Sequence, residues 1–186
     1  MKWTIPGTVL EITTAEIPAL EDKFQNMFLA GGMVLSQVSA VSGLEPYAVQ
    51  NWVKRGFLSA PVQKRYNLQQ LCRILTINML KSCLTLEQIC GMLEYVNGNL
   101  QDESDDLILD SDLYFLFVKL AAYHRQMNTP QGRDQHLQQL LDGYPERVPG
   151  AKQRIGKVLT VMLTAWAAAQ LQQQAQYMIS QLKPLQ

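Results

Sequence analysis

The sequence of this 186-residue chain predicts an all-α protein built in two parts. Pro and Gly separate segments whose apolar residues recur every three or four positions, the spacing of a helix with one buried face. The alternation of apolar and polar residues that marks a half-buried strand is nearly absent. Hydrophobic residues make up 47% of the chain and charged residues 17%, which is typical of a globular protein and excludes a disordered or fibrous one.

In the first part of the chain, Pro, Gly and capping residues mark where helices begin and end. Pro46 suits the first turn of a helix, Gly43 and Gly56 suit helix ends, and Asn67 and Thr85 suit N-caps. We therefore expect helices over 19–30 (started by Pro18), 36–43 (capped by Ser36), 46–56, 67–80 and 85–97, with a loop or small hairpin over 57–66.

The second part follows an acidic stretch, Gln101 to Asp106, which we interpret as a linker. The expected helices are 112–126 capped by Ser111, 130–142 opened by Thr129-Pro130, and 151–182 as one long helix or two stacked pieces. The predicted organisation is thus a first domain over 17–98, an acidic linker over 99–110 and a helical dimerisation or effector region over 111–186.

Charge is segregated along the chain although the total is zero. The window from Pro46 to Leu86 holds six basic residues and no acid, and the window from Glu87 to Asp112 holds eight acids and no base. Because salt screens charge beyond about 8–10 Å, a polyanion would sense the basic window locally. Two interpretations of each window stay open: an interaction surface, or an ordinary solvated helix face or linker.

The residues from Leu35 to Leu93 predict a helix-turn-helix, two short helices joined by a tight turn at Gly43-Leu44-Glu45. Its apolar residues would meet between the helices: Val38, Val41, Leu44, Val49 and Trp52. The second helix would present Tyr47, Gln50, Asn51, Lys54 and Arg55 outward. Gln and Asn pair with adenine, and Lys and Arg pair with guanine or phosphate, so this face suits a DNA major groove.

The segment after this helix, GFLSAPVQKRY, carries the chemistry of a wing that grips a sugar–phosphate backbone. Pro61 stiffens it, and Lys64, Arg65 and Tyr66 arrive at a loop tip. Basic groups neutralise phosphate and release counterions. We expect Tyr47 and Tyr66 to donate hydrogen bonds to phosphate, and Trp52 to be a core anchor.

The run from Gly43 to Leu93 resembles the winged helix-turn-helix of the MerR superfamily. The similarity lies in an ordered series: Trp52 at the family's aromatic position, Gly56-Phe57-Leu58 at the wing start, Arg65-Tyr66 at the wing end, and Leu84 to Ile89 as its Phe-Ser-Leu-Glu-Glu-Ile-like segment. The chain is similar in particular to an uncharacterised bacterial family of MerR-like proteins with a domain of unknown function. The resemblance implies a DNA-binding regulator over about residues 17–98.

Other chemistries find little support in the sequence. Cys72, Cys83 and Cys90 fall on apolar helical positions without CxxC spacing or neighbouring His, so we expect buried inert thiols, no metal and no cofactor. No P-loop, GxSxG or HExxH motif is present, so we expect no enzyme. Reduced cysteines and the lack of a signal peptide or membrane span indicate a cytoplasmic protein.

Two functions stay open. The first is a sequence-specific transcriptional regulator that binds double-stranded DNA as a homodimer, associated through 113–182. The second is a protein–protein adaptor on a winged-helix scaffold, with the acidic window as its docking surface. A small-molecule effector is not indicated, although Met162, Trp166, Tyr177 and Met178 would line either a pocket or, more in keeping with such stripes, a core or subunit interface.

Overall fold

The computed structural model describes residues 2–98, 107–126, 129–146 and 148–182, and these residues are mostly helical. The sequence predicts an all-α chain, and the structure confirms a mainly α protein with four short strands among the described residues. The elements are β1 (Lys2–Thr4), β2 (Glu11–Thr13), a 3-10 helix (Thr14–Ala19), α1 (Leu20–Met27), β3 (Met33–Val34), α2 (Leu35–Ser42), α3 (Pro46–Lys54), β4 (Arg65–Tyr66), α4 (Leu68–Leu80), α5 (Leu86–Asn97), α6 (Asp110–Gln126), α7 (Pro130–Asp142) and α8 (Ala151–Ser180).

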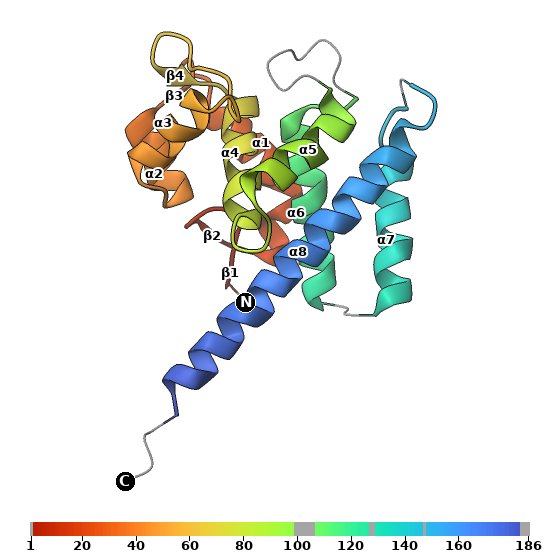
Figure 1. Ribbon diagram of the computed structural model, residues 1–186. Helices are drawn as coiled ribbons and strands as arrows, with labels where there is room; N and C mark the ends of the chain where they lie inside the picture. Colours follow the sequence, from red (N-terminus) through yellow and green to blue (C-terminus); the bar gives the residue numbers. More distant parts are fainter. Residues whose placement is uncertain (1, 99–106, 127–128, 147, 183–186) are drawn as a thin grey trace.

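The elements are arranged around α4 and α6, which pack against each other in the middle of the molecule (Figure 1). The helices α2 and α3 lie with β3 and β4 at one end, and α7 lies at the other. The long helix α8 packs against α4, α5, α6 and α7, and its C-terminal half then projects away from the body.

Both parts of the chain contribute to a single hydrophobic core. Buried residues of α2 to α5 and of α6 and α8 belong to one contiguous cluster. Across it, Arg73 Nη2 of α4 pairs with Asp110 Oδ2 of α6 at 2.8 Å, with both side chains about 5% exposed. The expected division between 17–98 and 111–186 therefore does not separate two cores. The acidic residues 99–106 of the expected linker lie outside the described residues.

An N-terminal hairpin, β1 paired antiparallel with β2, is not predicted by local sequence patterns. Each strand has three residues, which is too short for alternation to stand out. Trp3 faces Ile12 across the pair, and both are buried, as is Ile5. The buried Tyr114 Oη of α6 donates to the carbonyl of Pro6 at 2.8 Å, which fixes this hairpin to the second half of the chain.

Several helix boundaries differ from the expected ones for local reasons. The first segment divides into the 3-10 helix and α1 instead of running from 19 to 30. Helix α2 begins at Leu35 with Val34 as N-cap, because the Val34 amide donates to the Gln37 side chain at 3.0 Å; Ser36 is not the cap. Helix α6 begins at Asp110, so Ser111 lies inside its first turn.

The remaining helix predictions are confirmed. Asn67 and Thr85 cap α4 and α5 by accepting hydrogen bonds from the amides of Gln70 and Gln88. Thr129 caps α7. The last segment is one continuous helix, α8. Among the described residues, no helix is long and apolar enough to cross a bilayer.

Candidate nucleic-acid interface

The turn between α2 and α3 is set by glycine, proline and buried apolar side chains. Gly43 has φ +70° and its amide donates to the Ser39 carbonyl at 2.8 Å, which ends α2. Pro46 opens α3, where its missing amide costs no helical hydrogen bond. The five apolar residues expected between the helices are all buried: Val38, Val41, Leu44, Val49 and Trp52. The prediction of Trp52 as a core anchor is therefore confirmed.

The C-terminal end of α3 is closed by a Schellman arrangement. The Phe57 amide donates to the Trp52 carbonyl at 3.0 Å, and the Gly56 amide donates to the Val53 carbonyl at 3.1 Å. Gly56 has φ +78°, a conformation that glycine adopts without strain. The chain then turns back and buries Leu58, so α3 is anchored at both ends.

One face of α3 is open to solvent. Tyr47 is 72% exposed, and Gln50, Asn51 and Lys54 are exposed as well. These residues are three and four positions apart, so they share one side of the helix. The face therefore offers one phenol, two amides and one ammonium group, and no acidic residue of α3 lies among them.

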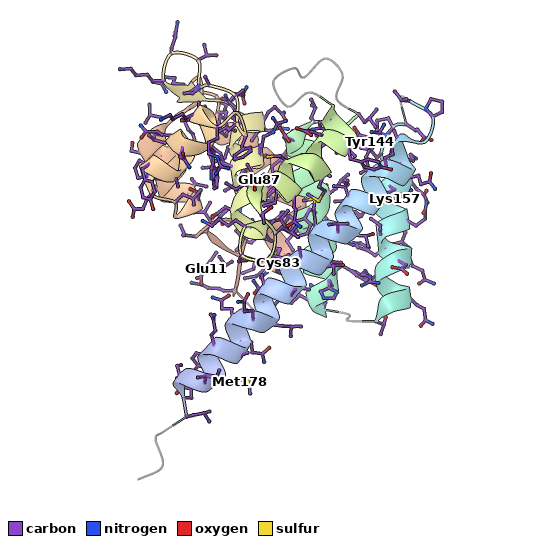
Figure 2. All side chains as sticks on the ribbon, viewed as in Figure 1. Glu11, Cys83, Glu87, Tyr144, Lys157 and Met178 are labelled. Atoms are coloured by element: carbon purple, nitrogen blue, oxygen red, sulfur yellow. The ribbon has the colours of Figure 1, made fainter. Side chains whose placement is uncertain are left out.

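Arg55 lies at the edge of this face and already has partners. Its Nη2 donates to Glu87 Oε1 of α5 at 2.6 Å, and its guanidinium lies 4.5 Å from the centroid of the Phe57 ring. The pKa of the Glu87 carboxyl is lowered by its own backbone amide and then by Arg55. Figure 2 labels Glu87 on the body of the protein, beside the end that carries α3. Because the pair is exposed, a phosphate can compete for Arg55 at little cost.

A short two-stranded sheet stands beside α3. Its strands, β3 and β4, pair antiparallel although α2 and α3 lie between them in the sequence. A bridge between Val62 and Arg65 closes a small hairpin at the start of β4. Lys64 is exposed at the turn, and Arg65 Nη1 donates to the Gly32 carbonyl at 2.9 Å. A Cβ at Gly32 would lie 2.9 Å from the Tyr66 carbonyl oxygen, so glycine allows β3 to approach β4. The expectation of a loop or small hairpin over 57–66 is confirmed.

Tyr66 is placed differently from the other expected interface residues. It is 3% exposed and belongs to the core, and burial raises the pKa of its phenol. The expectation that Tyr66 donates to phosphate is therefore wrong, because its ring serves the packing beneath the hairpin. We leave Tyr66 out of the interface and keep Tyr47, Gln50, Asn51, Lys54, Arg55, Lys64 and Arg65.

Two amide side chains of α4, the buried Gln70 and the partly buried Asn78, hold the candidate interface in place. The side chain of Gln70 in α4 donates to the carbonyls of Ser59 and Ala60 at 3.1 and 3.0 Å, which fixes the base of the hairpin. The side chain of Asn78 donates to the carbonyls of Gly7 and Ser42 at 2.9 Å each, which fixes the end of α2. Helix α4 carries other polar residues as well, among them Gln69, Arg73 and Thr76, so its sequence does not single out Gln70 and Asn78 for these bonds.

The basic and acidic windows neutralise each other in part. Arg73 is buried against Asp110, and Arg55 pairs with Glu87. Burial lowers the pKa of Lys81, whose ammonium group lies 6.0 Å from the centroid of the Trp52 ring. Lys81 is nevertheless exposed, so the basic groups near α3 that face solvent without an ion pair to an acid are Lys54, Lys64, Arg65 and Lys81. Asp110 is buried in its pair with Arg73, so it cannot be part of an exposed acidic docking surface.

The three cysteines, which were also considered for metal or redox chemistry, do not form a common site. Cys72 and Cys90 are buried as expected, and burial raises the pKa of both thiols, that of Cys90 to about 11. Cys83 is exposed, so the expectation of a buried thiol is wrong there: it lies in the turn after α4 and not on a packed face. Figure 2 labels it at that turn. In the described ranges no group of His, Cys, Asp and Glu is arranged to hold a metal ion.

The four residues considered for an effector pocket do not lie together. Met162 and Trp166 are in the core, whereas Tyr177 and Met178 are 65% and 60% exposed on the projecting part of α8. Figure 2 shows Met178 there, away from the body. A groove of about 1030 Å³ lies between this part of α8, β1 and the end of α6, and Trp3, Trp166 and Arg125 contribute to its lining.

Comparison with known proteins places the chain in a family. Residues 13–117, more than half of the chain, match the family described as "Domain of unknown function (DUF1836)", and the chain belongs to this family. The chain is 30% identical over 119 residues to "Uncharacterized protein YkrK" of Bacillus subtilis (strain 168). That match covers 61% of the chain and 51% of the relative, so the chain spans about half the length of this relative. No solved structure matches the chain.

Proposed function

We propose that this protein is a sequence-specific DNA-binding transcriptional regulator of MerR-like type. In this proposal α2 and α3 act as the helix-turn-helix, and the small hairpin at Val62–Arg65, supported by the β3–β4 pair, acts as the wing. The observation that carries the proposal is the exposed face of α3, on which Gln50, Asn51 and Lys54 stand together without an acidic neighbour on that helix. A face of amides and a cation on a short, firmly anchored helix matches the hydrogen-bonding groups of a major groove.

The contacts divide by their chemistry. Gln50 and Asn51 are the base readers, because an amide pairs with both N6 and N7 of adenine. Lys54 and Arg55 contact guanine or phosphate, and Lys64 and Arg65 neutralise phosphates beside the groove. Tyr47, near the start of α3, donates to phosphate through its hydroxyl. Arg55 joins the contact by exchanging Glu87 for a phosphate.

The proposal includes a homodimer formed through the projecting part of α8. Every residue from Gln170 to Leu182 is exposed, and no charged residue lies between Val158 and Leu182. One side of this segment carries exposed residues at alternating intervals of three and four: Val161, Thr164, Ala168, Leu171, Ala175, Met178 and Leu182. This is the spacing of a coiled-coil seam, and its alanines allow two helices to approach closely. A two-fold dimer would set two α3 helices about one DNA turn apart, roughly 34 Å.

The direct test is selection from a library of random duplexes by the full-length protein. We expect one enriched sequence with two half-sites, and we expect Gln50→Ala/Asn51→Ala to lose the base preference while it still binds DNA weakly. Gln135→Ala/Gln139→Ala on α7 is the matched control, because it removes two exposed amides at the opposite end of the molecule from α3.

Two outcomes would contradict the proposal. One is that no sequence is enriched. The other is that the α3 variant enriches the same sequence as the unaltered protein. In either case the adaptor function becomes the better interpretation, and a protein partner whose capture survives nuclease treatment would support it.

A further inference from the structure

The groove between the N-terminal hairpin and the projecting half of α8 has the size of a small-molecule site. Its volume is about 1030 Å³, at the upper end of the range for pockets that bind small organic ligands. Residues 3–8 form one part of its lining, and residues of α8 between 166 and 176 form another (Figure 1). Residues of α4 and of the ends of α4 and α6 complete the lining.

The part of the lining that follows β1 is held in a fixed shape by the body of the protein. The Tyr114 hydroxyl donates to the Pro6 carbonyl at 2.8 Å, and the Asn78 side chain donates to the Gly7 carbonyl at 2.9 Å. Gly7 has φ +76°, and a Cβ there would lie 2.2 Å from the Leu75 carbonyl oxygen, so glycine allows this turn to lie directly on α4. A wall that is already fixed can bind a ligand without the entropic cost of ordering the chain.

Two of the three tryptophans of the chain contribute to the lining of this groove. Trp3 is 5% exposed and faces Ile12 across the hairpin, and Trp166 is 8% exposed. The ring of Trp166 packs against the edge of Phe117, with the ring centroids 6.1 Å apart. Both indoles are therefore held in place by packing, and they give the groove a rigid apolar floor that suits a flat ring system.

The charge of the lining has one sign. Arg125 is exposed at the end of α6, and none of the described residues that line the groove is acidic. The neighbouring His124 is mostly neutral at neutral pH, because burial and then Arg133 lower its pKa. Gln170 and Gln173 of α8 add exposed amides. The groove thus combines one cation with hydrogen-bonding groups, an arrangement that favours an anion over a cation.

We propose that this groove is a binding site for a flat aromatic carboxylate, with the ring system against Trp3 and Trp166 and the carboxylate on Arg125. A planar guanidinium can donate two parallel hydrogen bonds to one carboxylate. Trp166, Gln170 and Gln173 are four and three positions apart, so they share one side of α8, and the seam proposed for the dimer runs along the opposite side. The site lies apart from α3 and does not depend on the function proposed above.

Three probes that share one ring system and differ in charge test the ligand class: naphthalene-2-carboxylate, naphthalene-2-methanol and naphthalene-2-methylammonium. The readout is the set of indole N–H resonances of the isotope-labelled full-length protein, one each for Trp3, Trp52 and Trp166. We expect the carboxylate to shift the resonances of Trp3 and Trp166 and to leave that of Trp52, which is buried between α2 and α3. The carboxylate should bind about tenfold more tightly than the alcohol, and the ammonium no more tightly than the alcohol.

Substitutions at exposed positions of the lining separate the charge from the ring contact. Arg125→Gln should weaken binding of the carboxylate about tenfold and leave binding of the alcohol unchanged, because only the carboxylate uses the guanidinium. Gln170→Glu adds an acid to the lining and should weaken the carboxylate in the same way, again without effect on the alcohol. Lys157→Gln, at an exposed lysine on the other half of α8, is the control for the loss of one positive charge (Figure 2).

Three results would overturn this assignment. The first is that the carboxylate shifts the resonance of neither Trp3 nor Trp166. The second is that the three probes bind equally, or that Arg125→Gln binds the carboxylate as tightly as the unaltered protein does, because the cation would then not select the ligand. The third is that the two resonances change with protein concentration and not with any probe, which would mean that a second copy of the chain occupies the groove. DNA binding by α3 is tested separately by the selection described above.

Discussion

At the scale of single residues, the interface depends on which polar groups are free and which are already bonded. Composition alone counts six cations between Pro46 and Leu86. In the structure Arg73 is buried in the core and Arg55 is paired with Glu87. The other four cations face solvent: Lys54, Lys64, Arg65 and Lys81. The number of basic residues in a window therefore overstates the charge that a polyanion would meet.

The Arg55–Glu87 pair leads to a prediction for DNA affinity. Glu87→Gln removes the charge that competes with phosphate for Arg55, so the dissociation constant for the selected duplex should fall about two- to fivefold. Because the pair is exposed, thermal stability should hardly change. Binding measured by fluorescence anisotropy at fixed salt, with an exposed acid of the same helix changed by Glu94→Gln as control, tests this. Equal effects of the two substitutions would show that only net charge matters.

At the scale of elements, the sequence predicts helices well where a cap or a glycine bounds them. Asn67 and Thr85 mark the starts of α4 and α5, and Gly43 and Gly56 mark the ends of α2 and α3. The hairpin of β1 and β2 is missed because three-residue strands carry no periodicity. Its stability comes from partners distant in sequence, such as the contact between Tyr114 and Pro6.

The candidate site can be predicted from the sequence where helical spacing determines it, and not where contacts between distant segments do. The exposed positions of α3 follow from helical spacing once Trp52 is assigned to the core. The inward position of Tyr66, the bond from Arg65 to Gly32 and the bonds from Gln70 to the hairpin depend on where distant segments meet. Those contacts have no counterpart in local sequence patterns.

The pairing of α4 with α6 gives a prediction for stability. Arg73→Met leaves Asp110 buried without its partner, so the free energy of unfolding should fall by about 3–5 kcal/mol. The double variant Arg73→Met/Asp110→Leu should recover most of this loss, because no uncompensated charge remains. Chemical denaturation followed by circular dichroism measures both values.

An exposed pair serves as the matched control. Lys23→Met breaks the ion pair between Lys23 and Glu16, and it should change stability far less than Arg73→Met. A double variant at the α4–α6 pair that is as unstable as Arg73→Met would contradict the account. The stabilising contribution would then come from other bonds of Asp110 and not from matching the two charges.

At the scale of the whole molecule, the acidic stretch does not mark a boundary between cores. The buried cluster runs from α2 to α8, and the family match over residues 13–117 also crosses this stretch. A composition shift in the sequence indicates a linker only when no packing spans it. Here α4 and α6 pack closely although they lie on opposite sides of the shift.

The projecting half of α8 carries the prediction for assembly. Leu171→Glu/Met178→Glu places charges on the proposed seam, so the protein should become monomeric in light scattering after gel filtration. Gln173→Glu/Gln176→Glu adds the same charge on another side of the helix and should leave the dimer intact. A monomeric unaltered protein, or a dimer that survives the seam variant, would contradict assembly through this seam.

The central claim is that a small set of exposed cations around α3 and the hairpin holds duplex DNA, and the salt dependence of binding measures this directly. For the unaltered protein, log affinity should fall steeply with log salt concentration. The variant Lys54→Ala/Arg55→Ala/Lys64→Ala/Arg65→Ala should bind about a hundredfold more weakly, with a slope shallower by about 3–4 for each bound protomer. The control Lys119→Ala/Arg133→Ala/Lys152→Ala/Lys157→Ala removes the same charge elsewhere and should keep the original slope. Equal slopes for the two variants would contradict the claim.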